Sequence, residues 1–358
     1  MGDPAARRPG RNGRAAGGGP GVPDAIDAAI DAGGGTAVGV TGVLSGRPTH
    51  DRVEQALVTE RPRLVGLAYR ITGSRLDAED IVQESWERAR RTDAEAIERP
   101  AAWLTTVVSH LALDHLRSAQ HRRETYVGPW LAEPVATARP DAPPAGRPTA
   151  MAGGGGEDPA TMVELAESLT FGFLRLLEAL SPVERVVFVL ADVFATPFPE
   201  IAVAIDRSPD ACRQIATRAR ARVRDEGRRQ HAPDDADRVA DELVAALVGG
   251  DTDRVLALLA PDVVLLSDGG PTTHAARRPV VGSDRVARFM LNLVRKAVAF
   301  QVEVERTELN GAPAVVVLFG DQPLFATAFT VDDARVAAIH SVVNPDKLAA
   351  LRLDGPIV

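Results

Sequence analysis

The residue types that could do chemistry in this chain of 358 residues are concentrated between Arg207 and Arg229. Eight arginines stand there against three acidic residues, although the whole chain has a formal charge of −8. Guanidinium groups bind phosphate, and they can read guanine through two hydrogen bonds. Local charge, not total charge, decides whether a protein can approach DNA. The stretch therefore predicts a nucleic-acid contact on an acidic chain, which favours recruitment to DNA through a partner.

A helix-turn-helix would position these arginines. Short helices are expected around 180–188 and 199–202, followed by a tight turn at 206–207. Ser208 can cap the next helix, and Pro209 suits its first turn. On a helical wheel, that helix separates an apolar face from a polar one. The apolar face is formed by Cys212, Ile215, Ala216, Ala219 and Val223. The polar face is formed by Arg213, Thr217, Arg220 and Arg224. This pattern is how a protein places a basic second helix in the DNA major groove.

Two earlier helices carry polar faces of other kinds. A helix around 76–91 presents outward the residues Asp80, Gln83, Glu84 and Glu87. Taken alone, this is a solvated acidic face. A helix around 100–118 gathers on one side Trp103, His110, Asp114 and Arg117. That side is suited to stacking on unpaired bases and hydrogen-bonding to them; the alternatives are a core position for the tryptophan and an inert surface position for the histidine.

In this order and spacing, the three elements resemble bacterial RNA polymerase sigma factors of the extracytoplasmic-function group. The resemblance covers Arg61 to Arg224 apart from a linker. It implies that the acidic face docks on the clamp helices of the polymerase β′ subunit, where carboxylates would complement a basic coiled coil. It also implies that the helix around 100–118 opens the −10 promoter element and captures flipped bases.

The helix-turn-helix resembles the family's reader of the −35 element. The candidates for groove or phosphate contact are Ser208, Arg213, Gln214, Thr217, Arg218 and Arg220. The chain departs from the family at Ser109-His110, where many relatives carry Arg-Asn. A changed base preference or a weaker −10 contact is therefore expected.

Composition suggests where the domains begin and end. The first residues are rich in Gly, Ala, Arg and Pro, so they are expected to be disordered, or untranslated if Val40 or Val43 is the start. Density of Pro and Gly marks a later linker. The expected parts are the extension 1–48, a core-binding and −10 domain at 49–126, the linker 127–159, a −35 domain at 160–230 and a further domain at 234–358.

The last part changes from helices to strands. Helices are expected at about 236–248, at about 253–259 and after Ser283, and β-rich segments at 263–266, 302–309, 314–319, 324–331 and 335–343. Asn310-Gly311 predicts a hairpin. Helices before strands imply an α+β domain with one curved antiparallel sheet, which resembles the cone of SnoaL-like proteins. The expected fold class is multidomain: two all-α sigma modules, the second a helix-turn-helix, followed by an α+β SnoaL-like cone.

Three short motifs resemble those of a sigma subgroup with such a fused domain. Trp130 to Pro134 reads WLAEP where the subgroup has WLPEP, Asp268 to Thr272 reads DGGPT where it has DGGGK, and Asn344 to Leu348 matches NPDKL fully. The resemblance implies that the tail is a built-in regulator. Its expected contact residues are Trp130, Leu131, Glu133, Asp268, Asn344, Pro345, Asp346 and Lys347.

The residues themselves give a modest argument for the same contact. Trp130 and Leu131 are apolar in a polar linker and need a surface to pack against. A tail docked on them would fix the separation of the two DNA-binding domains, and only some separations match a promoter. The alternative for 344–346 is a turn that starts the final helix.

Other functions have weaker support. Acid–base catalysis in the tail would use Asp268 or His274, but neither is accompanied by metal-ligand spacing, a nucleophile motif or a phosphate loop. We therefore expect no enzyme, cofactor or metal, and small-ligand sensing by the tail stays open. A plain helix-turn-helix regulator would not need the acidic docking helix.

The expected partners are the RNA polymerase core and promoter DNA, without a membrane. Cys212 is the only cysteine, which excludes an internal disulfide and indicates a reducing cytoplasm. Its place on the apolar face predicts a core residue. No apolar run is long enough to span a bilayer.

Overall fold

A computed structural model describes residues 48–93, 97–124, 126–137, 168–226, 235–271, 273–298 and 302–352. The expected N-terminal extension up to residue 47 and the linker residues 138–159 lie outside the described residues. No described helix is long and apolar enough to cross a membrane.

The first helical module consists of α2 (Pro48–Thr72), α3 (Arg75–Arg91) and α4 (Pro100–Glu124), which pack on one another. Helix α2 ends at Thr72, because the next residue, Gly73, adopts a φ of 74° that a side chain disfavours. The Ser74 hydroxyl then caps α3 by accepting from the Asp77 N–H at 3.0 Å. Local capping thus places the sharp turn between α2 and α3.

The second helical module contains α6 (Phe171–Leu177), α7 (Pro182–Phe188), the π-turn η2 (Val189–Val193), α8 (Phe198–Ile205) and α9 (Pro209–Glu226). The predicted tight turn is confirmed by Asp206, whose φ is 52°. The predicted cap is confirmed by the Ser208 hydroxyl, which accepts from the Ala211 N–H at 3.2 Å. Cys212 is fully buried on the apolar face of α9, as predicted. These features make α8 and α9 a helix-turn-helix.

The tail, residues 235–352, begins with α10 (Ala236–Gly249) and α11 (Thr252–Leu258) and carries α12 (Ser283–Val298) after its first two strands. Its strands are β1 (Leu259–Asp268), β2 (Val280–Val281), β3 (Glu303–Leu309), β4 (Ala312–Phe319), β5 (Gln322–Asp332) and β6 (Arg335–Val342). They form one sheet in the order β2-β1-β6-β5-β4-β3. Short helices α13 (Pro345–Leu348) and η3 (Ala349–Arg352) follow.

The sheet is mixed, not wholly antiparallel as expected, since β1 pairs in parallel with β6. A parallel pair needs a long crossover, and α12 with strands β3 to β5 supplies it. Asn310 and Gly311 have φ values of 54° and 70°, which confirms the predicted two-residue hairpin. Asp333 and Ala334 make a second such turn that the sequence did not predict.

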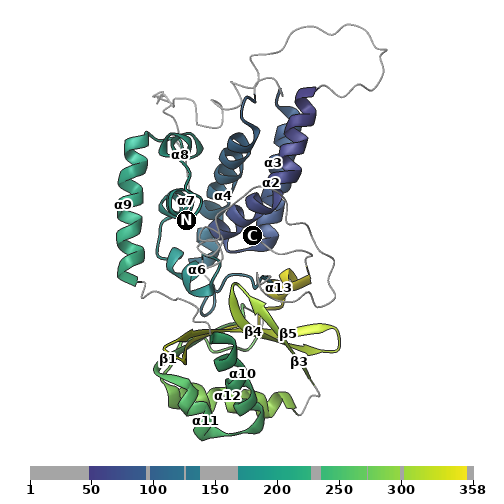
Figure 1. The fold of residues 1–358 in the computed structure, drawn as a ribbon, viewed down its shortest axis with the longest axis vertical. Helices are drawn as coiled ribbons and strands as arrows, with labels where there is room; N and C mark the ends of the chain where they lie inside the picture. The colour runs from purple at the N-terminus through teal and green to yellow at the C-terminus, as the bar shows by residue number, and fades with distance from the viewer. Residues whose placement is uncertain are drawn as a thin grey trace, which may run out of the picture. The chain divides into compact units, whose positions relative to one another are not determined.

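The two faces of the sheet pack against different parts of the chain. Helices α10, α11 and α12 cover one face (Figure 1), and apolar side chains fill the space between helices and sheet. The other face contributes to a cluster that is continuous with the cores of both helical modules, through Leu266, Ala314, Val316, Ala326, Ala328 and Val342. The tail is therefore packed on the helical modules through an apolar sheet face.

Candidate functional site

The outer face of α9 is open. Arg213, Gln214, Thr217 and Arg218 are exposed, and Arg220 is half-buried. The Arg213 guanidinium pairs with Asp210 and lies 5.7 Å from the centre of the Phe198 ring. Arg220 pairs with Asp192 at 2.6 Å. The expected −35 residues thus share one accessible surface, with Ser208 exposed at its start.

On the corresponding face of α4, the polar residues of the expected −10 set contact one another. Asp114 lies between His110 and Arg117, with His110 Nε2 and Arg117 Nη1 each 3.3 Å from one of its carboxylate oxygens. Trp103 is half-buried against the apolar core. Ser109 is fully buried and donates to the Thr105 carbonyl at 2.6 Å. At the position where this chain departs from the family pattern, the serine therefore faces the core and the histidine faces out.

The outer face of α3 is acidic and exposed, as its spacing predicts. Asp80, Gln83, Glu84 and Glu87 are all exposed. Two of these carboxylates pair along the helix, Glu84 with Arg88 at 2.8 Å and Glu87 with Arg91 at 3.4 Å. Exposed pairs of this kind contribute little stability, so they are easily exchanged for contacts with a partner.

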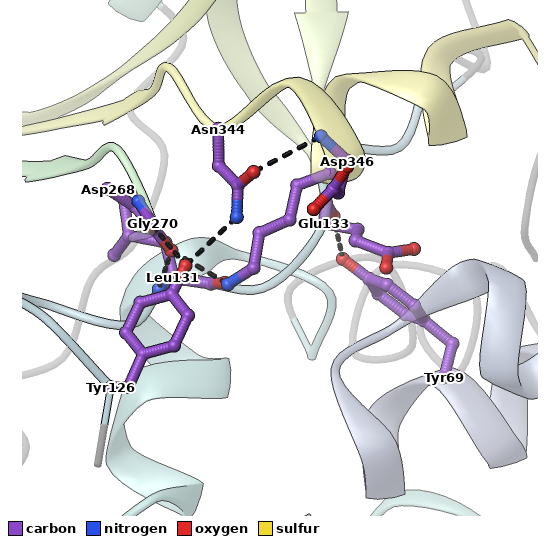
Figure 2. A network of polar contacts seen from close by, with 9 residues as sticks. Tyr69, Tyr126, Leu131, Glu133, Asp268, Gly270, Asn344 and Asp346 are labelled. Atoms are coloured by element: carbon purple, nitrogen blue, oxygen red, sulfur yellow. Dashed lines mark hydrogen bonds and ion pairs between the residues drawn. The ribbon is translucent and has the colours of Figure 1, made fainter. Parts of the chain in front are cut away.

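The linker segment, residues 126–137, meets the tail first at Asp268 (Figure 2). This carboxylate is fully buried. One oxygen accepts from the Tyr126 hydroxyl at 2.6 Å and from the Gly270 N–H at 3.1 Å. The other accepts from the Leu131 N–H at 2.8 Å and from Lys347 Nζ at 2.7 Å. Two motifs of the tail and one of the linker thus meet at one carboxylate, which we call the charged contact.

Lys347 of the charged contact also binds the linker segment. Its ammonium group also donates to the Leu131 carbonyl and lies 4.0 Å from the centre of the Trp130 ring. Such a cation–π contact is strongest where water is excluded, and Lys347 is buried. The indole of Trp130 in turn lies over Gly73, where a Cβ atom would come within 2.5 Å of the ring.

Asn344 has two roles in the structure. Its side-chain oxygen accepts from the Asp346 N–H at 3.1 Å and so caps α13, as the turn interpretation predicted. Its side-chain nitrogen donates to the Tyr126 hydroxyl at 3.0 Å (Figure 2). Pro345 is exposed in the first turn of α13, and Asp346 is exposed and joins the network through its backbone N–H.

Glu133 faces the first helical module instead of the tail. Its carboxylate accepts from the N–H groups of Arg75 and Leu76 at the start of α3, at 2.7 and 3.1 Å. Burial raises the pKa of this carboxyl, and the backbone N–H groups work in the opposite direction. The Glu133 N–H donates to the Gly73 carbonyl at 2.9 Å. The linker segment is thus hydrogen-bonded directly to the turn between α2 and α3.

A second meeting point, which we call the neutral contact, centres on Asn310 in the β3–β4 turn. Its side-chain nitrogen donates to the Tyr69 hydroxyl at 2.6 Å and to the Leu169 carbonyl at 2.9 Å. Its side-chain oxygen accepts from the Val135 N–H at 3.1 Å. One fully buried amide therefore bonds to α2, to the segment before α6 and to the linker.

Sequence reasoning missed Asn310, Tyr69 and Tyr126 as contact residues. The hairpin signal explained the backbone of Asn310 and gave no reason to look at its side chain. The low number of tyrosines was one available signal. The chain has only two, and both lie in these contacts. Burial raises the pKa of each phenol, so both are neutral hydroxyl donors.

The two helical modules also touch each other directly. Helix α4 packs against α7 and α8, and Arg99 pairs with Glu200 at 2.9 Å. Arg70 of α2 is fully buried, lies 5.4 Å from the centre of the Phe194 ring and donates to the Ser168 hydroxyl at 2.7 Å. Burial lowers its pKa to about 9, which leaves it charged at neutral pH.

A small cavity lies between α6 and the sheet. It has about 20 Å³ of free space, room for roughly one water molecule, and its lining includes Phe171 and His340. The two rings stack with their centres 5.6 Å apart. Among the described residues, no group of three or more His, Cys, Asp or Glu side chains is arranged to hold a metal ion.

A three-helix module with an acidic face on α3, a helix-turn-helix after it and an attached α+β domain together define the class of protein. Residues 57–122 match the sigma-70 region 2 family and residues 171–223 match sigma-70 region 4. The chain belongs to the extracytoplasmic-function group of RNA polymerase sigma factors. It therefore binds the polymerase core and promoter DNA, directs transcription initiation, and comes from a family of proteins that are not enzymes.

Among its relatives is the ECF RNA polymerase sigma factor SigJ of Mycobacterium tuberculosis, 43% identical over 298 residues, which are 80% of this chain and 90% of SigJ. The probable ECF sigma factor SigI of the same species is 32% identical over 85% of this chain and 98% of its own length. The crystal structure of SigJ matches with a TM-score of 0.63 at 37% identity, covering 84% of this chain and all of that one. Similarity on this scale includes the SnoaL-like tail as well as the sigma modules.

Proposed function

We propose that the tail regulates this sigma factor by fixing the arrangement of its two promoter-reading modules. The observation that carries the proposal is the charged contact. There, one buried carboxylate of the tail, Asp268, bonds to the linker at Tyr126 and Leu131 and to the C-terminal motif at Lys347. Removing any one partner leaves buried polar groups unsatisfied, so the contact is either complete or absent.

The proposed mechanism is geometric. Helix α4, with the −10 candidates, lies against α8 of the helix-turn-helix. The neutral contact at Asn310 bonds at once to Tyr69 of the first helical module and to Leu169 beside the second. While both contacts are formed, the two readers cannot change their separation to suit a promoter. Opening the contacts would leave only the direct packing between the two modules to hold them, so we propose that the tail inhibits in this arrangement.

We propose that Asp80, Gln83, Glu84 and Glu87 dock on the β′ clamp helices. Their exposure on one face of α3 supports this, because charge complementarity across an interface needs accessible carboxylates. We further propose −10 contacts at Trp103, His110, Asp114 and Arg117, and −35 contacts at Ser208, Arg213, Gln214, Thr217, Arg218 and Arg220. The −35 set is supported by its exposure on α9.

We propose no catalytic role for the tail. Both oxygens of Asp268 are occupied by hydrogen-bond donors, and His274 is exposed in a loop. Acid–base chemistry needs an ionisable group positioned beside a substrate, and neither residue offers that here. The proposed place of action is the cytoplasm, where the polymerase works. The proposed domain boundaries, 49–126, 127–159, 160–230 and 234–358, contain the two matched sigma regions.

Run-off transcription with purified core polymerase on genomic promoter fragments, including the protein's own upstream region, tests the sigma assignment and the docking face. The wild-type chain should give specific transcripts, and the double variant Asp80→Arg/Glu84→Arg should give none and fail to pull down core. The matched control is Asp253→Arg/Asp321→Arg, which reverses two exposed charges of the tail. Unchanged pull-down by the first variant would refute the docking face.

The same assay tests the regulatory proposal. Asp268→Asn removes the charge of the charged contact with little change in shape, and it should raise transcript yield at equal sigma and core concentrations. Asp332→Asn, an exposed residue at the end of β5, is the control and should leave the yield unchanged. Equal or lower yield from Asp268→Asn would contradict an inhibitory closed arrangement.

A further inference from the structure

Positive charge in the tail is gathered in one short stretch. Between Arg277 and Lys296 the chain has six cationic residues and one acidic residue, Asp284. The rest of 234–358 has six cationic and seventeen acidic residues. A domain that is acidic overall thus carries a concentrated basic element, as the whole chain does at its helix-turn-helix.

The cations of α12 lie on one side of the helix. Arg285, Arg288, Arg295 and Lys296 follow one another at steps of three, seven and one residues, which keeps them within a stripe about 100° wide. All four are exposed, as are Arg277 and Arg278 in the preceding loop. The stripe is about 16 Å long at 1.5 Å per residue. We call these six residues the basic face of the tail.

The basic face lacks internal counter-charges. Within the described residues, none of its six cations has a carboxylate oxygen within 4.0 Å. Three other arginines of the tail are paired with carboxylates: Arg238 with Asp235 at 2.8 Å, Arg306 with Asp241 at 2.6 Å, and Arg254 with Glu242. Like charges kept together without counter-charges repel each other, and an external polyanion would relieve that repulsion.

We propose that the basic face binds the phosphate backbone of duplex DNA, as a contact additional to those of α4 and α9. Five of its six cations are arginines, whose planar donors match phosphate oxygens. A straight row of cations suits a duplex, which carries one negative charge per roughly 1.7 Å of its axis. The proposal needs no particular promoter sequence and does not depend on the regulatory contacts at Asp268 and Asn310.

The test is the salt dependence of DNA binding by the full-length chain, measured by fluorescence anisotropy on a labelled 40-base-pair duplex of random sequence. The variant Arg288→Gln/Arg295→Gln/Lys296→Gln removes three cations of the basic face. Each lost phosphate contact should reduce the slope of log affinity against log salt by about 0.9. Between 50 and 200 mM salt, the wild-type chain should therefore lose about 40-fold more affinity than the variant.

Two further variants control for charge and folding. Arg238→Gln/Arg254→Gln/Arg306→Gln removes the same charge from paired arginines of the same domain and should leave the slope close to that of wild type. Arg288→Lys/Arg295→Lys keeps the charge and should keep the slope. The proposal is overturned if both glutamine variants change the slope equally or not at all, or if wild-type binding at 50 mM salt is weaker than about 100 μM, the weak end of the non-specific range. Loss of affinity for core polymerase, with duplex binding unchanged, would also overturn it and assign the face to an acidic protein surface.

Discussion

The linker segment meets the tail at two places that are built differently. At the charged contact, the buried Asp268 carboxylate is balanced by the Lys347 ammonium and by uncharged donors. At the neutral contact, the Asn310 amide satisfies its donors and acceptor with a phenol and two backbone groups. The first joins the linker to two distant parts of the tail, and the second joins the tail to both helical modules.

The two contacts differ in the free energy needed to bury their polar and charged groups. Burying a carboxylate and an ammonium removes both from water, so the pair is stable only while both partners are present. Burying an amide with all its hydrogen bonds made costs much less. The charged contact is therefore the one that a single change should open completely, and the neutral contact should weaken by steps.

Two backbone amides of the linker report on the two contacts separately. The Leu131 N–H donates to Asp268, and the Val135 N–H donates to Asn310. Hydrogen exchange at these amides measures the free energy of opening each contact. If the contacts open together, both amides should always show the same free energy of opening.

The largest effect is expected from Lys347→Met. It leaves the Asp268 carboxylate buried without its counter-ion, which should reduce protection of the Leu131 amide by about 3–5 kcal/mol. Lys296→Met on the exposed face of α12 is the control. Unchanged exchange at Leu131 would show that the lysine is not needed to bury Asp268.

A smaller loss is expected at the neutral contact from Asn310→Gly. Glycine keeps the positive φ of the turn and removes only the side chain, so the Val135 N–H loses its acceptor, at a cost of about 2 kcal/mol. The control is Asp333→Gly, which also replaces a side chain at a positive φ, here 47° in the exposed β5–β6 turn. It should change the stability of the chain little. Equal effects in the two turns would mean that the Asn310 side chain adds nothing.

A third prediction concerns the loss of folding stability at low pH, which we assign to His340 and not to either contact. Burial lowers the pKa of His340 to about 4, against an ordinary value of 6.5. Between these values the unfolded chain binds more protons than the folded chain, so stability falls as pH falls. The loss between pH 7 and pH 5 should be about 2 kcal/mol in urea unfolding.

The variant His340→Phe should remove this part of the pH dependence, and His274→Gln, at an exposed histidine, should leave it in place. If the loss at pH 5 persists in His340→Phe, the acid sensitivity belongs to another group, and the charged contact becomes the first place to look.

The smallest predicted effect compares the two hairpin turns directly. Ala334 has a φ of 56°, which disfavours any side chain, so Ala334→Gly should stabilise the chain by about 0.5–1 kcal/mol. Gly311→Ala in the β3–β4 turn, where φ is 70°, should destabilise it by a similar amount. Thermal unfolding measures both. A decrease for Ala334→Gly would mean that the exposed turn is not strained.

Sequence-based prediction succeeded for the features that depend on residues close together in the chain. The cap at Ser208 and the apolar face of α9 are set by residues within a few positions, so they follow from the chain itself. The charged contact was predicted mainly because its motifs resemble those of a known subgroup, with a modest argument from the apolar residues Trp130 and Leu131 of the linker. The neutral contact and the parallel β1–β6 pair depend on segments far apart in the chain meeting in space, and no local pattern encodes which ones meet.

The neutral contact also decides how the stretch 138–167 is anchored. On one side of this stretch Thr137 bonds to Glu308, and on the other the Leu169 carbonyl bonds to Asn310, so both ends are fixed at the β3–β4 turn. If the chain were cut between Thr137 and Ser168, both new ends would still be held at this turn, so the two pieces should remain together as a non-covalent sigma factor.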